Sequence, residues 1–338
     1  MQPAPLSDVL LHAERTKRHL AAVVLIAASS ACSGAGGQLT ARTPPPTVAP
    51  APPASVPTTR PTATTPTTTA PPTTHPYERA RPTSAESLAA ELTEAETAIR
   101  DPNVDTETGR AWGRRAQQLY GMLTANPSSA DEVLATVGEE VAVDVELNWT
   151  ARQNLSALVT STSLATQLPA WRIDEAAPPE VLLGYYREAE ASTGVPWTVL
   201  AAINLIETRM GRIEGLSTAG AVGPMQFLPS TWEACCKGDP TVDRDAILGA
   251  AAYLEQSGAL SDLDGAIFAY NHSDRYVRAV RAYADILARD ALAYRGFHGF
   301  EVYFLSSVGL LHLAPGYEEQ TAVDAATWVA AHPDALVD

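Results

Sequence analysis

One carboxylate sits on a strongly apolar stretch of this chain, and it is the side chain best suited to acid–base chemistry. Apolar residues recur at helical spacing between residues 196 and about 210, namely Val199, Ile203, Ile206 and Met210. Glu207 lies four residues after Ile203, so it projects from the edge of this stripe. No basic residue stands three or four positions away, so no ion pair within the helix can neutralise it. A carboxyl buried without a cation has a raised pKa and suits a general acid. The alternative is a surface glutamate at the margin of the stripe, or one paired with a distant arginine.

A glycine-rich loop follows this helix. Three glycines fall within nine residues, at Gly215, Gly220 and Gly223, which indicates tight turns or close approach of the backbone to another group. Met225 and Gln226 come directly after it and supply an apolar surface and an amide. That pair suits a sugar with an N-acetyl group, because the methyl packs and the amide forms hydrogen bonds.

These residues, in this order, resemble the soluble lytic transglycosylases, which are lysozyme-like enzymes that cleave peptidoglycan. The resemblance rests on Glu207, Ser217, Gly220-Ala221-x-Gly223-x-Met225-Gln226 and Ala269-Tyr270-Asn271, and it covers residues 178 to 288. Each piece alone is a weak signal, whereas the ordered set is specific. The chain looks most like secreted or lipoprotein members from actinobacteria. The resemblance implies a lysozyme-like helical catalytic domain that needs no cofactor and no metal.

The resemblance also implies a role for each matched residue. Glu207 would be the single catalytic acid and base, held by a hydrogen bond from Tyr270. The residues implied in substrate binding are Ser217, Met225, Gln226, Tyr270 and Asn271. The chain departs from the family pattern at Thr208, where serine is usual, and at Pro224, where leucine is common.

The implied reaction cleaves the β-1,4 bond between N-acetylmuramic acid and N-acetylglucosamine without consuming water. Glu207 would protonate the leaving oxygen and then take a proton from the sugar's own 6-hydroxyl, which leaves a 1,6-anhydro end. An ordinary glycosidase needs a second carboxylate, and the motif segments offer only Glu214 and Asp274. Two alternatives remain: a hydrolytic muramidase that uses the same glutamate, and a catalytically inactive module that binds the cell wall.

Other chemistries lack their sequence signatures. The segment Gly215-Leu216-Ser217-Thr218-Ala219 lacks the last glycine of a nucleophile elbow, and the chain contains neither H-E-x-x-H nor a phosphate-binding loop. The net charge of −16 argues against a general nucleic-acid binder, which needs a basic face.

The elements that must position these residues are predicted to be mainly α-helical. Composition and the resemblance together divide the 338 residues into five predicted segments. They are a signal peptide (1–32), a disordered Pro/Thr-rich linker (33–83), a helical N-terminal region that acts as a brace (84–172), the lysozyme-like transglycosylase domain (173–292) and a C-terminal extension (293–338). Two apolar runs, 300–305 and 310–313, are separated by Ser306-Ser307-Val308-Gly309 and predict a short β-hairpin in that extension.

The N-terminal segment predicts export. Basic residues precede a short apolar run that ends in small residues and Cys32, which is typical of a secretory signal with a relaxed lipoprotein motif. We therefore expect an extracytoplasmic protein of the cell envelope, either lipidated at Cys32 or freely secreted. Its partner would be the glycan strands of peptidoglycan, with membrane contact only through the lipid. Cys235 and Cys236 are adjacent; we interpret them as two small apolar side chains, with a vicinal disulfide as the alternative.

Overall fold

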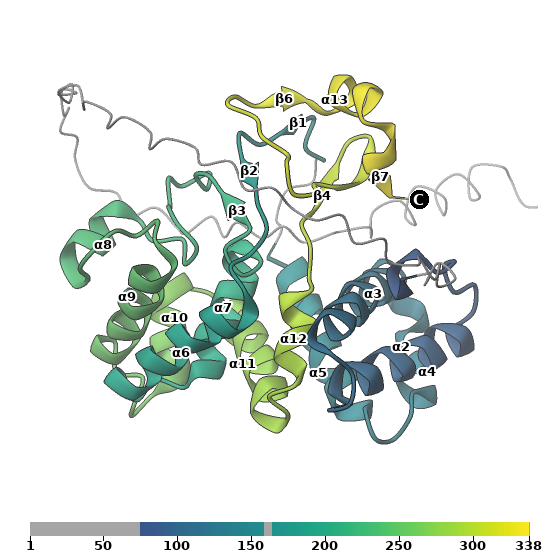
Figure 1. The fold of residues 1–338 in the computed structure, drawn as a ribbon, viewed down its shortest axis with the longest axis horizontal. Coiled ribbons are helices and arrows are strands. Elements are labelled where there is room, and N and C mark those ends of the chain that lie inside the picture. Colours follow the sequence, from purple (N-terminus) through teal and green to yellow (C-terminus); the bar gives the residue numbers. More distant parts are fainter. Residues whose placement is uncertain (1–74, 159–163, 338) are drawn as a thin grey trace, which may run out of the picture. The chain divides into compact units, whose positions relative to one another are not determined.

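The computed structural model describes residues 75–158 and 164–337, which all belong to one compact unit of the chain (Figure 1). The predicted signal peptide, Cys32 and the linker up to residue 74 lie outside the described residues. Residues 75–83, which the sequence assigns to the linker, are held against the helices that follow. The guanidinium of Arg115 donates to the carbonyls of Arg79 and Ala80 at 3.1 and 2.7 Å. The packed region therefore begins earlier than predicted.

Four helices form the N-terminal part of this unit: α2 (Ala85–Arg100), α3 (Thr106–Ala125), α4 (Ala130–Thr136) and α5 (Ala142–Ser156). The side chain of Ser84 caps the start of α2, and that of Asp105 caps the start of α3. Their apolar faces meet in one core cluster that runs from Leu88 to Trp149. This core is separate from the one that surrounds Glu207.

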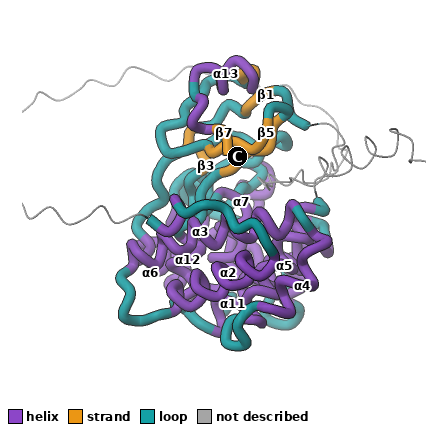
Figure 2. Tube along the Cα trace, turned by 90° about the vertical axis from the view of Figure 1, so that its right-hand side faces the viewer, coloured by secondary structure: helices purple, strands orange, loops and turns teal. Residues whose placement is uncertain are grey.

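The second and largest core is built by seven further helices. They are α6 (Pro179–Thr193), α7 (Trp197–Thr208), α8 (Pro229–Cys235), α9 (Asp243–Gln256), α10 (Leu263–Asn271), α11 (Asp274–Arg289) and α12 (Ala293–His298). Helix α11 packs against both α5 and α7, so it joins the two helical groups. Figure 2 shows these helices gathered on one side of the strands.

The strands are short and pair segments that are far apart in the sequence. β1 (Gln167–Leu168) pairs antiparallel with β6 (Val323–Asp324), and β2 (Arg172–Ile173) pairs with β3 (Ile213–Glu214). β4 (Tyr303–Ser306) and β5 (Gly309–His312) form the hairpin that the sequence predicts, and β7 (Leu336–Val337) adds a third strand. Together with α13 (Ala325–Ala331) they enclose a small third core. The prediction of a mainly helical chain with a C-terminal hairpin is thus confirmed.

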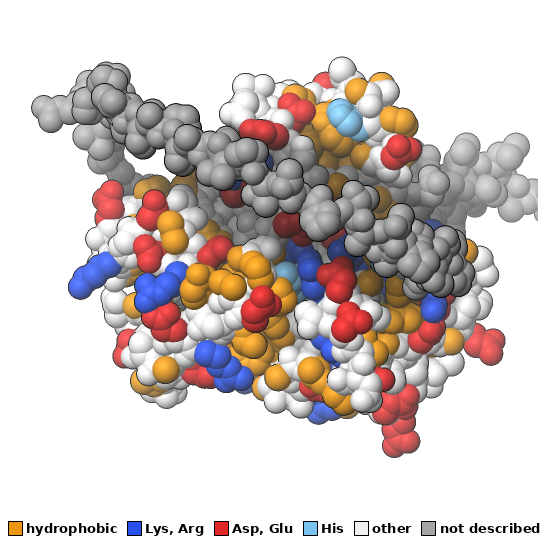
Figure 3. Space-filling view, in the orientation of Figure 1, with side chains coloured by type: hydrophobic (Ala, Val, Ile, Leu, Met, Phe, Trp, Pro, Cys, Tyr) orange, Lys and Arg blue, Asp and Glu red, His pale blue; other side chains and the backbone are white. Residues whose placement is uncertain are grey.

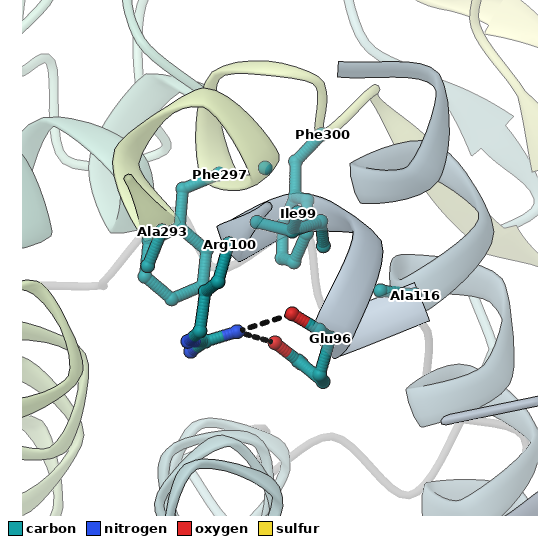
Figure 4. Close-up of a pocket in the computed structure, with 8 residues that line it drawn as sticks. Glu96, Ile99, Arg100, Ala116, Ala293, Phe297 and Phe300 are labelled. Atoms are coloured by element: carbon teal, nitrogen blue, oxygen red, sulfur yellow. Dashed lines mark hydrogen bonds and ion pairs between the residues drawn. The ribbon is translucent and has the colours of Figure 1, made fainter. Parts of the chain in front are cut away.

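Helix α12 links the two helical cores, although the sequence places it in the C-terminal extension. It packs on α3, and Gly296 lies so close to Ile99 that an added Cβ would stand 2.9 Å from that side chain. Figure 4 shows the junction, where Arg100 turns toward Glu96 beside Phe297 and Phe300. The space left there is only about 10 Å³, so this junction is a packed contact and holds no ligand.

The adjacent cysteines at the end of α8 differ from the favoured interpretation. Cys235 and Cys236 are joined in a vicinal disulfide. Both side chains also pack partly against the large core, as small apolar groups do.

Candidate active site

Helix α7 carries Glu207 into the interior. Every residue of this helix is buried, and Glu207 itself is 4% exposed. The helix ends one residue later, because Arg209 and Met210 adopt left-handed backbone angles (φ 56° and 62°) before Gly211. Two consecutive non-glycine residues in this region are uncommon and mark a constrained turn. Glu207 is therefore held on a rigid helix immediately before a sharp change of chain direction.

The carboxyl of Glu207 has one hydrogen bond and no ion pair within the described residues. The hydroxyl of Tyr276 donates to Oε1 at 2.6 Å. Burial raises the pKa of Glu207 from its ordinary 4.5 to about 7, while the Tyr276 hydrogen bond and the charge of Arg209 act in the opposite direction. No second carboxylate of the described part contributes to this shift. The side chain thus titrates near neutral pH, as the apolar stripe predicts.

The turn between α10 and α11 brings Tyr276 to this carboxyl. Helix α10 ends where His272 adopts a left-handed conformation (φ 40°), and the side chain of Ser273 caps the first turn of α11. Tyr276 then points into the core, fully buried. Tyr276 is not among the site residues predicted from the sequence. The available signal was a phenol on the buried face of an amphipathic helix directly after Ala269-Tyr270-Asn271.

The predicted hydrogen bond from Tyr270 to Glu207 is wrong. The Tyr270 hydroxyl donates instead to the backbone carbonyl of Met225 at 2.6 Å. Its ring lies parallel to that of Tyr276, with 6.5 Å between the ring centroids. The physical reason is the turn between the helices: Tyr270 lies in the last turn of α10 and faces the loop, whereas Tyr276 lies in the first turn of α11 and faces α7.

The glycine-rich loop ends in a tight hairpin. Val222 and Phe227 exchange both backbone hydrogen bonds, at 2.8 and 3.0 Å. Gly223 is required at its tip, because its φ is 74° and an added Cβ would stand 1.8 Å from the carbonyl oxygen of Pro240. Met225 and Gln226 follow Pro224 in this hairpin, and the carbonyl of Pro224 faces α7.

Helix α7 binds this hairpin through the carbonyl of Pro224. Asn204 Nδ2 donates to it at 2.8 Å and the Thr208 hydroxyl at 2.6 Å. Tyr186 donates to Asn204 Oδ1 at 2.6 Å and so fixes the orientation of the amide. Thr208 therefore provides the hydroxyl that holds the loop, although it departs from the family's usual serine. Asn204 and Tyr186 are further positioning residues that the sequence analysis did not find.

Met225 and Gln226 have different surroundings. The Met225 side chain is fully buried in the large core, so it stabilises the loop from beneath; a contact with sugar, which the resemblance implies, would require it to move. Gln226 is half-buried with a left-handed backbone (φ 49°), and its Nε2 donates to the carbonyl of Gly223. Its Oε1 is buried and has no partner within the described residues, so this acceptor is free to bind a donor.

Ser217 and Asn271 are not joined to Glu207 by any hydrogen bond within the described residues. The hydroxyl oxygen of Ser217 accepts from the amides of Ala219 and Ala221, which shapes the loop. Asn271 is half-buried at the end of α10, and its side chain makes no hydrogen bond to the described part of the chain. The structure therefore links Glu207, Tyr276, Tyr270 and Met225 in one connected group.

This arrangement can perform acid–base chemistry with a single carboxyl. No group of three or more His, Cys, Asp or Glu side chains that could hold a metal occurs in residues 75–158 and 164–337. No helix in these residues is long and apolar enough to cross a bilayer.

In comparisons with known proteins, no family model, no curated protein and no solved structure matches this chain.

Proposed function

We propose that this protein is a peptidoglycan lytic transglycosylase that cleaves the bond between N-acetylmuramic acid and N-acetylglucosamine. The observation that carries the proposal is the buried carboxyl of Glu207, which has a pKa of about 7 and no ion pair within the described residues. A general acid works best when its pKa lies near the working pH. The lysozyme-like nature of the helical domain belongs to the same proposal and rests on the sequence motifs.

Glu207 acts twice in the proposed reaction. In its protonated form it donates to the glycosidic oxygen as the bond to N-acetylglucosamine breaks. As a carboxylate it then accepts the proton of the muramic 6-hydroxyl while that oxygen attacks C1, so the product is a 1,6-anhydro sugar and no water is consumed. Because the nucleophile belongs to the substrate, its effective concentration is high, and one carboxyl is sufficient. Tyr276 stabilises the carboxylate between the two steps through its hydrogen bond.

The lack of a companion carboxylate supports this mechanism over ordinary hydrolysis. Within the described residues, no Asp or Glu is among the groups that shift the pKa of Glu207. Glu214, one of the two candidates in the motif segments, is exposed and pairs with Arg172 across β2 and β3. A glycosidase with two carboxylates needs them about 5 to 10 Å apart.

The proposed substrate contacts use side chains of the motif segments that have unused hydrogen-bonding groups. We propose that Gln226 Oε1 accepts the N–H of an N-acetyl group, and that Asn271 binds a sugar hydroxyl. Ser217 and Tyr270 act through the loop that they shape. The glycan strands of peptidoglycan are the proposed partner, reached outside the cytoplasm after export, with lipidation at Cys32 or free secretion as the two routes.

Digestion of purified peptidoglycan tests the proposal. We expect the wild type to release fragments that are one water lighter than reducing-end fragments, and Glu207→Gln to release none. Fragments with reducing ends from the wild type would indicate a hydrolytic muramidase. Binding to peptidoglycan without any release would indicate an inactive wall-binding module.

A further inference from the structure

One cavity of the described part is lined by none of the candidate active-site residues. It has a volume of about 490 Å³, within the range of small-molecule sites. Its walls come from the first turns of α3, the segment that leads into α6, and the end of α12. The residues that carry the argument are Glu107, Arg110, Arg114, Glu175, Glu180 and His298. In Figure 3, basic and histidine atoms gather among acidic atoms just above the position where Figure 1 labels α12.

Two guanidiniums in this cavity have donors that no hydrogen bond to the described residues uses. Arg110 makes one such bond, from Nη1 to Glu107 at 2.8 Å. Arg114 makes none, although its Nε lies 3.2 Å from Glu301 and its Nη2 3.6 Å from Glu107 as ion pairs. The Nε atoms of both are buried without a hydrogen-bond partner. A guanidinium carries five N–H donors and binds a carboxylate best through two parallel hydrogen bonds. Both side chains are ion-paired, but their terminal nitrogens, one helical turn apart, keep donors for a carboxylate from outside.

Of the carboxylates that pair with these arginines, that of Glu175 is loosely held. Glu175 Oε2 lies 3.7 Å from Arg110 and 3.6 Å from Arg212, longer than a hydrogen bond, and its side chain is 65% exposed. The Arg212 side chain is only 3% exposed. Because Glu175 is exposed, it neutralises this buried cation weakly, and a ligand carboxylate can replace it.

His298 forms part of the cavity wall and is 1% exposed. Its Nε2 lies 2.9 Å from the carbonyl of Ala177, so that nitrogen carries the proton. Burial lowers the pKa of His298 to about 3, which keeps the ring neutral and leaves Nδ1 as an acceptor. Nδ1 has no partner within the described residues. A buried acceptor of this kind favours a ligand that also offers an N–H group.

The remaining walls distinguish between anions. Glu107, Glu175 and Glu180 contribute three carboxylates, so the site is not strongly basic and disfavours a dianion such as phosphate. Ala176, Pro178 and Pro179 provide apolar contacts for small side chains. A ligand that carries both a carboxylate and an ammonium matches this mixture of charges.

We propose that this cavity binds a zwitterionic amino acid or short peptide, with its carboxylate on Arg110 and Arg114 and its ammonium on the acidic side chains. The inference goes beyond the proposed glycan cleavage and does not depend on it. The carboxylate displaces Glu175, and the ammonium lies near Glu180.

Calorimetric titration of the whole protein with L-alanyl-L-alanine tests the proposal. We expect saturable one-to-one binding, weakened at least about tenfold when the ligand is the C-terminal amide or the N-acetylated dipeptide, since each loses one charged contact. Arg110→Gln should weaken binding by a similar factor. Arg281→Gln is the matched control, because Arg281 also pairs with an exposed aspartate but lies outside the cavity. Circular dichroism of each variant shows whether it is folded.

Glu180→Gln separates the two ends of the ligand. It should weaken binding of the dipeptide but leave that of N-acetyl-alanyl-alanine unchanged. Absence of saturable binding, equal affinity for the amide, or tighter binding of inorganic phosphate would each overturn the proposal. Repeating the titration with Glu207→Gln separates this proposal from the proposed glycan cleavage. Peptide binding by a protein that cleaves no peptidoglycan would refute only the proposed glycan cleavage. Cleavage by a protein that binds no peptide would refute only the proposed peptide site.

Discussion

Two buried glutamates in this protein have opposite surroundings. Glu207 and Glu96 are 4% and 3% exposed, and each accepts a hydrogen bond from a tyrosine, Tyr276 and Tyr120 respectively. Glu96 also accepts from Asn148 and pairs with Arg100 (Figure 4). Glu207 has no ion pair within the described residues.

The difference shows how one residue type can serve two purposes. The guanidinium beside Glu96 compensates its charge, and Asp144 extends the network by pairing with Arg100 and Arg289. Such a network joins α2, α5 and α11. Around Glu207 the same burial raises the pKa to about 7, so its proton is exchangeable at neutral pH. We interpret Glu96 as a structural group and Glu207 as a reactive one.

Replacing each carboxyl by an amide should give the largest difference in activity between the two sites. Glu207→Gln should lower the rate of peptidoglycan cleavage on the order of 10³-fold, because the amide can neither donate nor accept the proton. Glu96→Gln should leave the rate of the folded protein unchanged. The measurement is release of soluble fragments at 20 °C; similar losses in both variants would mean that the two sites do not differ in function.

For the free energy of unfolding, we expect the structural glutamate, Glu96, to matter. Glu96→Gln leaves Arg100 in a buried position with a weaker partner, and we expect a loss of about 3 kcal/mol in the free energy of unfolding. Glu94→Gln on the same helix is the control, since its pair with Arg79 is exposed and should contribute less than about 1 kcal/mol. Urea denaturation gives both values. A loss for Glu96→Gln no larger than that of the control would contradict the role of the network.

The pH dependence of the free energy of unfolding tests whether Glu207 titrates while it is buried. Because the folded-state pKa of Glu207 is raised from 4.5 to about 7, the folded protein loses stability as the pH rises through this window. Glu207→Gln removes that loss. The variant should match the wild type near pH 4 and exceed it by up to about 3 kcal/mol at pH 8. A constant difference between the two proteins across this range would exclude a buried, titrating carboxyl.

The tyrosine contacts carry the smallest effect. Tyr276→Phe removes a hydrogen bond that stabilises the carboxylate, so the pKa of Glu207 should rise and the alkaline limb of activity should move up by roughly one pH unit. Tyr270→Phe is the control, because its hydroxyl donates to the carbonyl of Met225. The pH profile of kcat distinguishes them; a larger shift from Tyr270→Phe would restore the pairing that the resemblance implies.

Features of this site that depend on residues close together in the sequence can be predicted from it, whereas contacts between residues far apart in the sequence cannot. The apolar stripe of α7 and the absence of a basic neighbour are local, and they predict the burial and raised pKa of Glu207. The exchange of Tyr270 for Tyr276 depends on the left-handed turn at His272, which no spacing rule reveals. The core position of Met225 likewise depends on a hairpin closed by contacts with Asn204 and Thr208.

The helices and strands divide in the same way into those that local sequence predicts and those that it does not. Long amphipathic helices and the β4–β5 hairpin are predicted from periodicity and a short turn. The two-residue strands β1 and β6 are not, because Leu168 and Val323 are far apart in the sequence and pair only through the tertiary structure. The Glu96 network is similarly non-local, since only Arg100 is a helical neighbour of Glu96.

Direct titration of the Glu207 carboxyl tests the central claim. Glutamate labelled with carbon-13 at the side-chain carboxyl gives one signal per residue, and the signal missing from Glu207→Gln identifies Glu207. We expect a titration midpoint of about 7 for that signal, because burial raises the pKa of Glu207. A midpoint near 4.5, the ordinary value for a glutamate in water, would contradict it.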